Sequence, residues 1–175
     1  MEAMTAAAST KIPVPLANDG RAGKYLAFQL GKEEYAIRVL KVREIIGVQE
    51  ITTVPQTPDY IRGVFNLRGK VIPVVDLQRK FGFATTENNA RTCIVVVEVA
   101  SAGRIMLMGI LVDAVSEVRN IAAGDIEDTP DFGRDVSVPY LLGVAKTKGQ
   151  VNLLLDIDSA LQTHEVEVLS SMAVS

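Results

Sequence analysis

Short hydrophobic runs dominate the chain from Lys24 onward. In the first of them, apolar and less apolar positions alternate through Tyr25-Leu26-Ala27-Phe28-Gln29-Leu30. The runs are rich in Val, Ile and Leu and are separated by Gly, Asn, Asp or Pro, which is typical of β-strands joined by turns. They cover residues 24–30, 34–39, 70–75, 92–99, 105–112, 141–145 and 150–155. Many short strands with turn signals between them favour a barrel or a sandwich.

The hydrophobic pattern also repeats within the chain. Two pairs of segments match, 36–45 with 109–118 at an offset of 73 residues, and 63–71 with 143–151 at an offset of 80. Two pairs of single residues keep the second offset: Tyr60 with Tyr140, and Asp76 with Asp156. The order of the matches is kept, and an insertion near residues 131–138 explains the change of offset. Chance similarity among valine-rich strands is the alternative explanation.

A tandem repeat predicts two small barrels, the first over residues 24–85 and the second over residues 91–162. Each half is marginal on its own, whereas two packed halves bury more apolar surface and leave a seam between them. Such a seam is a natural binding groove. The boundary is soft, because the first strand could pair with the second barrel. Residues 1–23 are predicted to form a disordered tail, and residues 163–175 a C-terminal helix or tail.

Short helices are expected at the end of each repeat. Asp76 is suited to cap a helix over residues 77–81, and Asp156 is suited to cap one over residues 157–161. A further short helix is expected after Thr163. Four glycines, at positions 63, 69, 143 and 149, are spaced across strands and are interpreted as the ends of hairpins.

Composition narrows the function. The net charge of −3 and the pI near 5.2 argue against a nucleic-acid partner, whose phosphates call for a basic surface. No apolar stretch is long enough to predict insertion into a membrane. The single cysteine, Cys93, lies in a hydrophobic run and is expected to be a small core residue. The single histidine, His164, is expected at the surface, and no metal, cofactor or catalytic motif is recognised.

Three groups of residues resemble the CheW family of chemotaxis coupling proteins. The first group consists of Tyr25–Gly31, Glu33–Ile37 and Val42–Ile45. The second group is the most specific and consists of Pro58–Gly63, Asn66–Gly69 and Val71–Leu77. The third group consists of Met108–Asp113 and Val115–Val118. Together they span roughly residues 24–161. Ala114, where the family often has glycine, and the longer turn at residues 101–103 are departures from the family pattern.

This resemblance implies a mainly β fold, with two tandem SH3-like five-stranded β-barrels packed around a hydrophobic seam, and short capping helices. It implies a non-enzymatic, cytoplasmic adaptor without a cofactor. Its partners are expected to be the cytoplasmic tip of chemoreceptors and the regulatory domain of a CheA-type histidine kinase. We expect the kinase to contact mainly the second barrel. A small enzyme or ligand-binding barrel and a nucleic-acid-binding barrel are the alternative classes.

The family match places the receptor-binding groove around Val42, Glu44, Asn66, Leu67, Arg68 and Gly69. Val42 and Glu44 are two residues apart, so on a regular extended segment they point to the same side. Glu44 and Arg68 are expected to pair across the seam, with the guanidinium holding the carboxylate through two hydrogen bonds. A purely structural pair, or an Arg68 that is only solvated at a turn, is the alternative.

Overall fold

Two β-sheets and a few short helices make up the fold. The computed structural model describes residues 20–82, 88–101, 103–128, 140–147 and 149–161. The strands are β2 (Gly23–Leu30), β3 (Glu33–Arg38), β4 (Val42–Gly47), β5 (Ile61–Leu67), β6 (Lys70–Asp76), β7 (Cys93–Ser101), β8 (Arg104–Val112), β9 (Ala114–Ile121), β10 (Ile126–Glu127), β11 (Leu141–Thr147) and β12 (Gln150–Leu155). The helices are α2 (Leu77–Lys80) and α3 (Ile157–Leu161), with 3-10 turns η2 (Val39–Lys41) and η3 (Ala123–Asp125).

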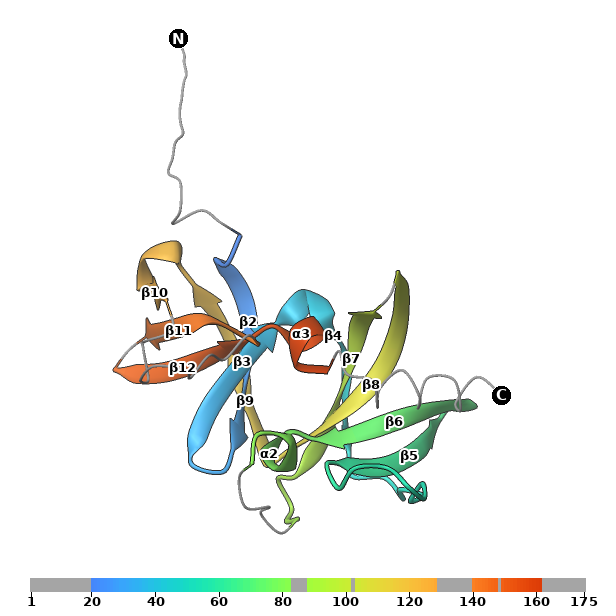
Figure 1. The fold of residues 1–175 in the computed structure, drawn as a ribbon. Coiled ribbons are helices and arrows are strands. Elements are labelled where there is room, and N and C mark those ends of the chain that lie inside the picture. The colour runs from blue at the N-terminus through green and yellow to red at the C-terminus, as the bar shows by residue number, and fades with distance from the viewer. Residues whose placement is uncertain (1–19, 83–87, 102, 129–139, 148, 162–175) are drawn as a thin grey trace.

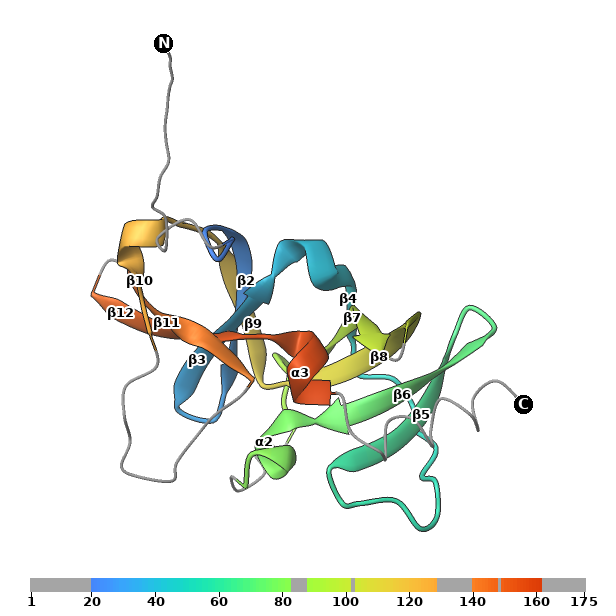
Figure 2. The same cartoon turned by 45° about the horizontal axis from the view of Figure 1, so that its top comes forward.

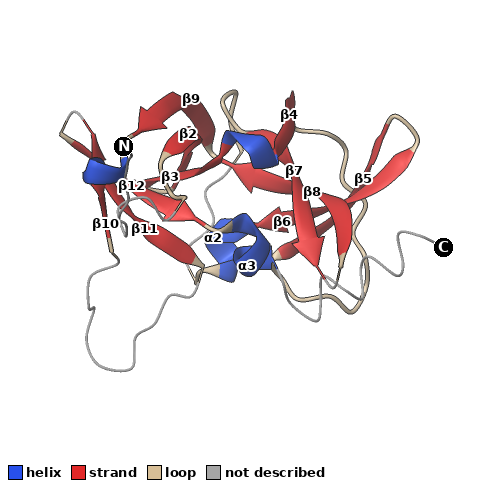
Figure 3. Cartoon of the chain, turned by 90° about the horizontal axis from the view of Figure 1, so that it is seen from above, coloured by secondary structure: helices blue, strands red, loops and turns tan. Residues whose placement is uncertain are grey.

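The strands form two sheets of matching design. The first sheet has the order β4-β7-β8-β6-β5 and is called the five-strand barrel; the second has the order β10-β11-β12-β3-β2-β9 and is called the six-strand barrel. The two sheets lie side by side, the six-strand barrel on the left of Figure 1. Both short helices lie where the two sheets meet: α2 and α3 overlap at the centre of the view from above (Figure 3), and α3 stands above α2 in Figure 1. The predicted fold class, a mainly β chain with two SH3-like units, is confirmed.

The two repeats exchange their first hairpins. Hairpin β2-β3 precedes β4 in the chain yet lies in the six-strand barrel, and hairpin β7-β8 lies in the five-strand barrel. Each exchanged hairpin is attached through a parallel pair, β3 with β12 and β8 with β6. The two parallel pairs are equivalent, since Ala36 and Leu154 pair in one, and Gly109 and Val74 in the other.

This exchange corrects the predicted domain boundaries. The five-strand barrel is continuous over residues 42–112, whereas the six-strand barrel combines residues 23–38 with residues 114–155. The predicted halves, 24–85 and 91–162, therefore do not coincide with the sheets. The reason is that a hydrophobic strand pattern specifies which faces are buried but not which neighbouring strand is the partner.

Alternating side chains divide the apolar residues into three clusters. The largest lies between the two barrels and includes Phe28, Ile37, Val95 and Ile110. This seam cluster draws on strands of both sheets, which is why the barrels are packed as one body. A second cluster fills the five-strand barrel, and a third, smaller one fills the six-strand barrel.

Two of the four repeated glycines lie inside strands. Gly63 in β5 and Gly143 in β11 each mark an irregularity in strand register. A Cβ atom on Gly63 would stand 2.1 Å from the carbonyl oxygen of Thr52, and one on Gly143 would stand 2.7 Å from a backbone oxygen of β10. Their interpretation as hairpin ends is therefore wrong, because they allow a close approach of backbone. Gly69 and Gly149 do lie at hairpin turns.

The predicted helices follow β6 and β12. Asp76 is buried and accepts a hydrogen bond from the Arg79 backbone N–H (3.3 Å), and Asp156 accepts one from the Ser159 N–H (3.4 Å). Asp76 also contacts the Arg62 guanidinium at 3.2 Å. Helix α3 has the predicted bounds, and α2 ends one residue earlier than predicted. The predicted N-terminal tail up to residue 19, the insertion near residues 131–138, His164 and the C-terminal helix lie outside the described residues.

Candidate functional site

An exposed ion pair stands at the rim of the five-strand barrel. Both guanidinium nitrogens Nη1 and Nη2 of Arg68 donate to the Glu44 carboxylate, with Nη1 lying 3.0 Å from each carboxylate oxygen. The Arg68 side chain is 69% exposed and the Glu44 side chain 24%. The fork geometry expected from the sequence is therefore present, in a place that a partner protein can reach.

The hairpin between β5 and β6 positions this arginine. Arg68 and Gly69 form the turn between paired residues Leu67 and Lys70, and both have positive φ angles, 50° and 91°. The Asn66 side-chain oxygen accepts a hydrogen bond from the Gly69 N–H at 2.7 Å, which closes the turn. Consecutive residues with positive φ are typical of tight hairpin turns that match strand twist. Arg68 is thus in the turn itself and not at the end of a strand.

The pair joins two edges of one barrel. Glu44 is on β4 and Arg68 follows β5, and these are the two end strands of the same sheet. The prediction that the pair crosses the seam between the barrels is therefore wrong. The hairpin β5-β6 projects from the five-strand barrel at the right of Figure 2. The turn of this hairpin therefore lies at the rim of the barrel.

A β-bulge separates Val42 from Glu44. Val42 pairs with Val97 and Glu44 pairs with Val96, so a step of two residues along β4 corresponds to a step of one residue along β7. Strand β4 therefore holds one extra residue at this point. Val97 belongs to the seam cluster and Val96 to the interior of the five-strand barrel. Val42 and Glu44 therefore point to opposite faces, and the prediction of a shared face is wrong because a bulge shifts the alternation.

The other predicted site residues fall into two sets. Asn66 and Gly69 are exposed beside Arg68, whereas Leu67 packs against the interior of the five-strand barrel. Val42 packs against the seam cluster. Ile45, which was not predicted, is 44% exposed next to Glu44 in β4. Ile45 pairs with Val95 of the seam cluster, so its side chain points to the opposite face of β4 from Glu44. The rim itself thus combines an exposed ion pair with a tight polar turn, a composition found at the polar edge of protein interfaces.

A second polar cluster lies inside the six-strand barrel, and sequence reasoning missed it. Arg119 Nη1 donates to Glu34 Oε1 and, at 2.8 Å, to Asn152 Oδ1, while its Nε lies 3.0 Å from Glu117 Oε2. Asn152 is fully buried and donates to Glu34 at 2.5 Å, and Ser116 donates to Glu34 at 2.9 Å. We call Glu34, Arg119 and Asn152 the polar triad. Every member has partners, as buried polar groups require.

The triad keeps its charges. Burial by itself raises the pKa of the Glu34 carboxyl, but hydrogen bonds from Asn152, Arg119 and Ser116 bring that pKa below its usual value. Burial lowers the pKa of Arg119, and its bonds to Glu34 and Glu117 outweigh this and raise it. The two groups therefore stabilise each other's ionised form.

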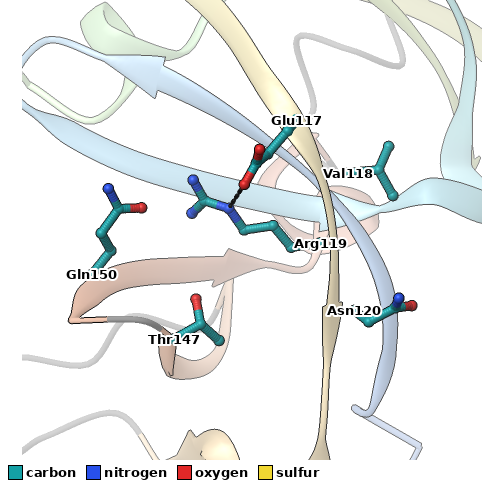
Figure 4. Close-up of a pocket in the computed structure, with 6 residues that line it drawn as sticks. All are labelled: Glu117, Val118, Arg119, Asn120, Thr147 and Gln150. Atoms are coloured by element: carbon teal, nitrogen blue, oxygen red, sulfur yellow. Dashed lines mark hydrogen bonds and ion pairs between the residues drawn. The ribbon is translucent and has the colours of Figure 1, made fainter.

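A pocket of about 430 Å³ opens beside Arg119, the one member of the triad that lines it. Its lining comes from β9 and from the ends of β11 and β12 (Figure 4): Glu117, Val118, Arg119, Asn120, Thr147 and Gln150. Arg119 and Glu117 face each other on the side of Gln150, and Val118 points the opposite way. The lining is dominated by hydrogen-bonding side chains.

Within the described part of the chain, no three histidine, cysteine or acidic side chains gather as metal ligands do. Burial raises the pKa of the Cys93 thiol, so the reactive thiolate is disfavoured. Cys93 is only partly buried, at the margin of the seam cluster. Among these residues, no helix is long and apolar enough to cross a membrane.

Comparison with known proteins gives one consistent family. The family model described as a CheW-like domain matches residues 24–165. The chain belongs to the CheW family. The Chemotaxis protein CheW of Klebsiella aerogenes is 34% identical over 160 residues, covering 91% of this chain and 94% of the relative. The Chemotaxis protein CheW of Rhizobium meliloti is 36% identical over 152 residues, covering 87% of this chain and 94% of the relative.

A solved structure agrees with this CheW assignment. The scaffolding protein TtCheW from Thermoanaerobacter tengcongensis is 31% identical and superposes with a TM-score of 0.71, covering 82% of this chain and 95% of that one. Protein FrzA of Myxococcus xanthus, which carries a different name, is 30% identical over 142 residues, covering 80% of this chain and 86% of FrzA. The resemblance stated from the sequence motifs is therefore confirmed: relatives of this chain are named chemotaxis proteins, and the one with the solved structure is named a scaffolding protein.

Proposed function

We propose that this CheW-family chain is a non-enzymatic adaptor that couples the cytoplasmic tips of chemoreceptors to a CheA-type histidine kinase. It acts in the cytoplasm, next to the membrane through receptor arrays, and needs no cofactor. The names of its relatives, chemotaxis proteins and a scaffolding protein, support this role. Two linked barrels, each with its own exposed rim, suit a protein that holds two partners together.

The observation that carries the receptor part of the proposal is the Glu44–Arg68 pair. A bidentate pair in which Arg68 is 69% exposed contributes little to folding stability, because exposed ion pairs are weak. The next residue, Ile45, exposes an aliphatic side chain on the other face of the same edge strand. A planar guanidinium held flat by Glu44 presents its remaining N–H groups in one fixed direction, which suits a partner with carbonyl or carboxylate acceptors.

Measuring receptor-tip and kinase binding on the same variants tests this site. Arg68→Ala and Glu44→Ala should each weaken binding to a receptor-tip fragment several-fold and leave binding to the kinase regulatory domain near normal. Arg68→Lys should also weaken receptor binding, because lysine keeps the charge but loses the fork. Arg43→Ala is the matched control, since Arg43 is also on β4 and forms an exposed ion pair with Glu98 (3.1 Å).

A double-mutant cycle completes the experiment. If the pair acts as a unit, the effects of Glu44→Ala and Arg68→Ala on receptor affinity should not add. Unchanged receptor affinity in both single variants, with circular dichroism showing both folded, would exclude this rim as the receptor site.

The kinase was expected on the second half of the chain, residues 91–162, and within this half we place the contact on the six-strand barrel, which holds all four described strands after residue 112. A small barrel offers strand edges to a similar barrel in a partner. Titration of isotope-labelled protein with the kinase regulatory domain should shift backbone amides of β9, β11 and β12 most. Shifts confined to β4, β5 and β6 would contradict this placement.

A further inference from the structure

The two barrels differ chemically at equivalent positions. The repeat offsets relate each member of the polar triad to an apolar residue of the five-strand barrel: Glu34 to Leu107, Arg119 to Ile46, and Asn152 to Ile72. All three apolar residues pack in the interior of the five-strand barrel. Equivalent positions are thus apolar in the five-strand barrel and polar in the six-strand barrel. Thr147, which lines the pocket, similarly replaces Leu67.

The rims differ as well. In the five-strand barrel, Glu44 reaches across to the hairpin turn and pairs with Arg68. Its equivalent in the six-strand barrel is Glu117, which pairs instead with Arg119 of its own strand, two residues along. The opening between β9 and the end of hairpin β11-β12 is where the pocket lies (Figure 4).

The charges at this pocket favour a cation. Arg119 shares its one positive charge between Glu34 and Glu117, so the three groups carry a formal net charge of −1. Glu34 is the better enclosed of the two carboxylates at 17% exposure, whereas Glu117 is 61% exposed at the rim. Lys24 of β2 pairs with Asn120, which lies three residues along β9 from Glu117. The positive charge of Lys24 is thus at the Asn120 end of the pocket. The excess negative charge therefore resides at the Glu117 end of the pocket, beside the 55% exposed Val118.

We propose that this pocket receives a basic side chain from a loop of the kinase regulatory domain, and that the loop continues over the edge strand β9 so that an apolar residue covers Val118 on the other face of this strand. Glu117 is the contact residue for the basic group. Arg119 is a positioning residue, because it holds the Glu117 carboxylate from below and is itself fixed by Glu34 and Asn152. This assignment rests on the proposed adaptor function and gives its kinase contact a site and a chemistry.

The test is calorimetric titration of the full chain with the kinase regulatory domain at several salt concentrations. Glu117→Lys should weaken binding at least tenfold and Glu117→Gln several-fold, and Glu117→Gln should flatten the dependence of affinity on salt. Val118→Ser should weaken binding without changing that dependence. The matched control is Glu127→Lys: Glu127 is 59% exposed on the same barrel and is also paired, with Lys146, but does not line the pocket.

The outcomes separate this site from the general function. Receptor-tip binding should be unaffected by the Glu117 variants. If the wild-type chain binds the kinase domain through the six-strand barrel but the Glu117 and Val118 variants bind equally well, the pocket assignment is wrong and the adaptor function stands. If the wild-type chain binds no kinase domain, both are wrong. A loss of affinity equal to that of Glu127→Lys also counts against the pocket, because it shows only a general effect of charge.

Discussion

The polar triad can be exchanged for its apolar counterpart, and this exchange tests whether the two barrels are truly equivalent. The triple variant Glu34→Leu, Arg119→Ile, Asn152→Ile gives the six-strand barrel the residues of the five-strand barrel. Each single substitution removes one partner from a buried network. The three single substitutions together should therefore destabilise the protein more than the triple substitution does.

The magnitudes follow from the partners left behind. Arg119→Ile leaves the ionised Glu34 carboxylate without its counter-ion. The free energy of unfolding should fall by about 2–4 kcal/mol. This is less than for a fully buried pair, because the Glu34 side chain is 17% exposed and keeps some contact with water. Asn152→Ile removes one partner each from Arg119 and Glu34, for about 1–3 kcal/mol. The triple variant leaves no unpaired member of the triad, so its stability should lie within about 1–2 kcal/mol of wild type.

Urea unfolding followed by circular dichroism measures these differences, provided that the slope m stays constant. The sum of the three single effects should exceed the triple effect by more than about 2 kcal/mol, a clear failure of additivity. A triple variant destabilised by the sum of its single substitutions would refute the equivalence of Ile46, Ile72 and Leu107 with the triad, because it would mean that the apolar set does not fit.

Three further predictions concern the same fold. Gly63→Ala should cost about 3 kcal/mol or more in urea unfolding, since its Cβ meets backbone, whereas Gly69→Ala, with open space around it, should cost only about 1 kcal/mol for its positive φ; equal costs would contradict the close approach. Asp76→Ala should destabilise more than Asp156→Ala, which should cost about 1 kcal/mol for the lost cap, because of the two only Asp76 is buried and paired with an arginine. Because the pKa of Glu34 is lowered by folding, its contribution is present above the unfolded-state pKa and is lost as pH falls through the folded-state pKa. The wild type should thus lose more stability on acidification than the triple variant does, as unfolding at a series of pH values would show.

The sequence was sufficient for the strands that alternate cleanly, such as β2 and β12, and for the internal repeat. It did not predict β9, whose exposed edge carries Ser116, Glu117 and Val118 in a row, because a bulge there breaks the alternation. Pairing of the first strand with the second barrel was allowed for, and β2 does pair with β9, but the exchange of whole hairpins was not predicted. Parallel pairing of β3 with β12 leaves no local signal, since both strands are hydrophobic on both faces.

The prediction of the site succeeded for the ion pair, whose geometry follows from the two side chains. It failed where the backbone register determines which face a side chain points to. Glu44 and Arg68 meet as expected, yet Val42 turns away because of one extra residue in β4. The polar triad could have been predicted from the sequence, because the repeat offsets make Arg119 and Asn152 equivalent to two isoleucines, Ile46 and Ile72. Comparing the chemistry of paired positions, and not only their identities, would have revealed it.

The hairpin exchange has a consequence for how the chain folds as it is synthesised. By the time residue 112 has left the ribosome, every strand of the five-strand barrel is available. Hairpin β2-β3, although made first, must wait for β9 and β12 before its sheet can form. During that interval its apolar face, including Phe28 and Ile37, can be covered only by the finished neighbour across the seam. Hairpin β2-β3, which is synthesised before every strand of the five-strand barrel, is therefore among the last described segments to be enclosed, and chaperone protection matters during this interval.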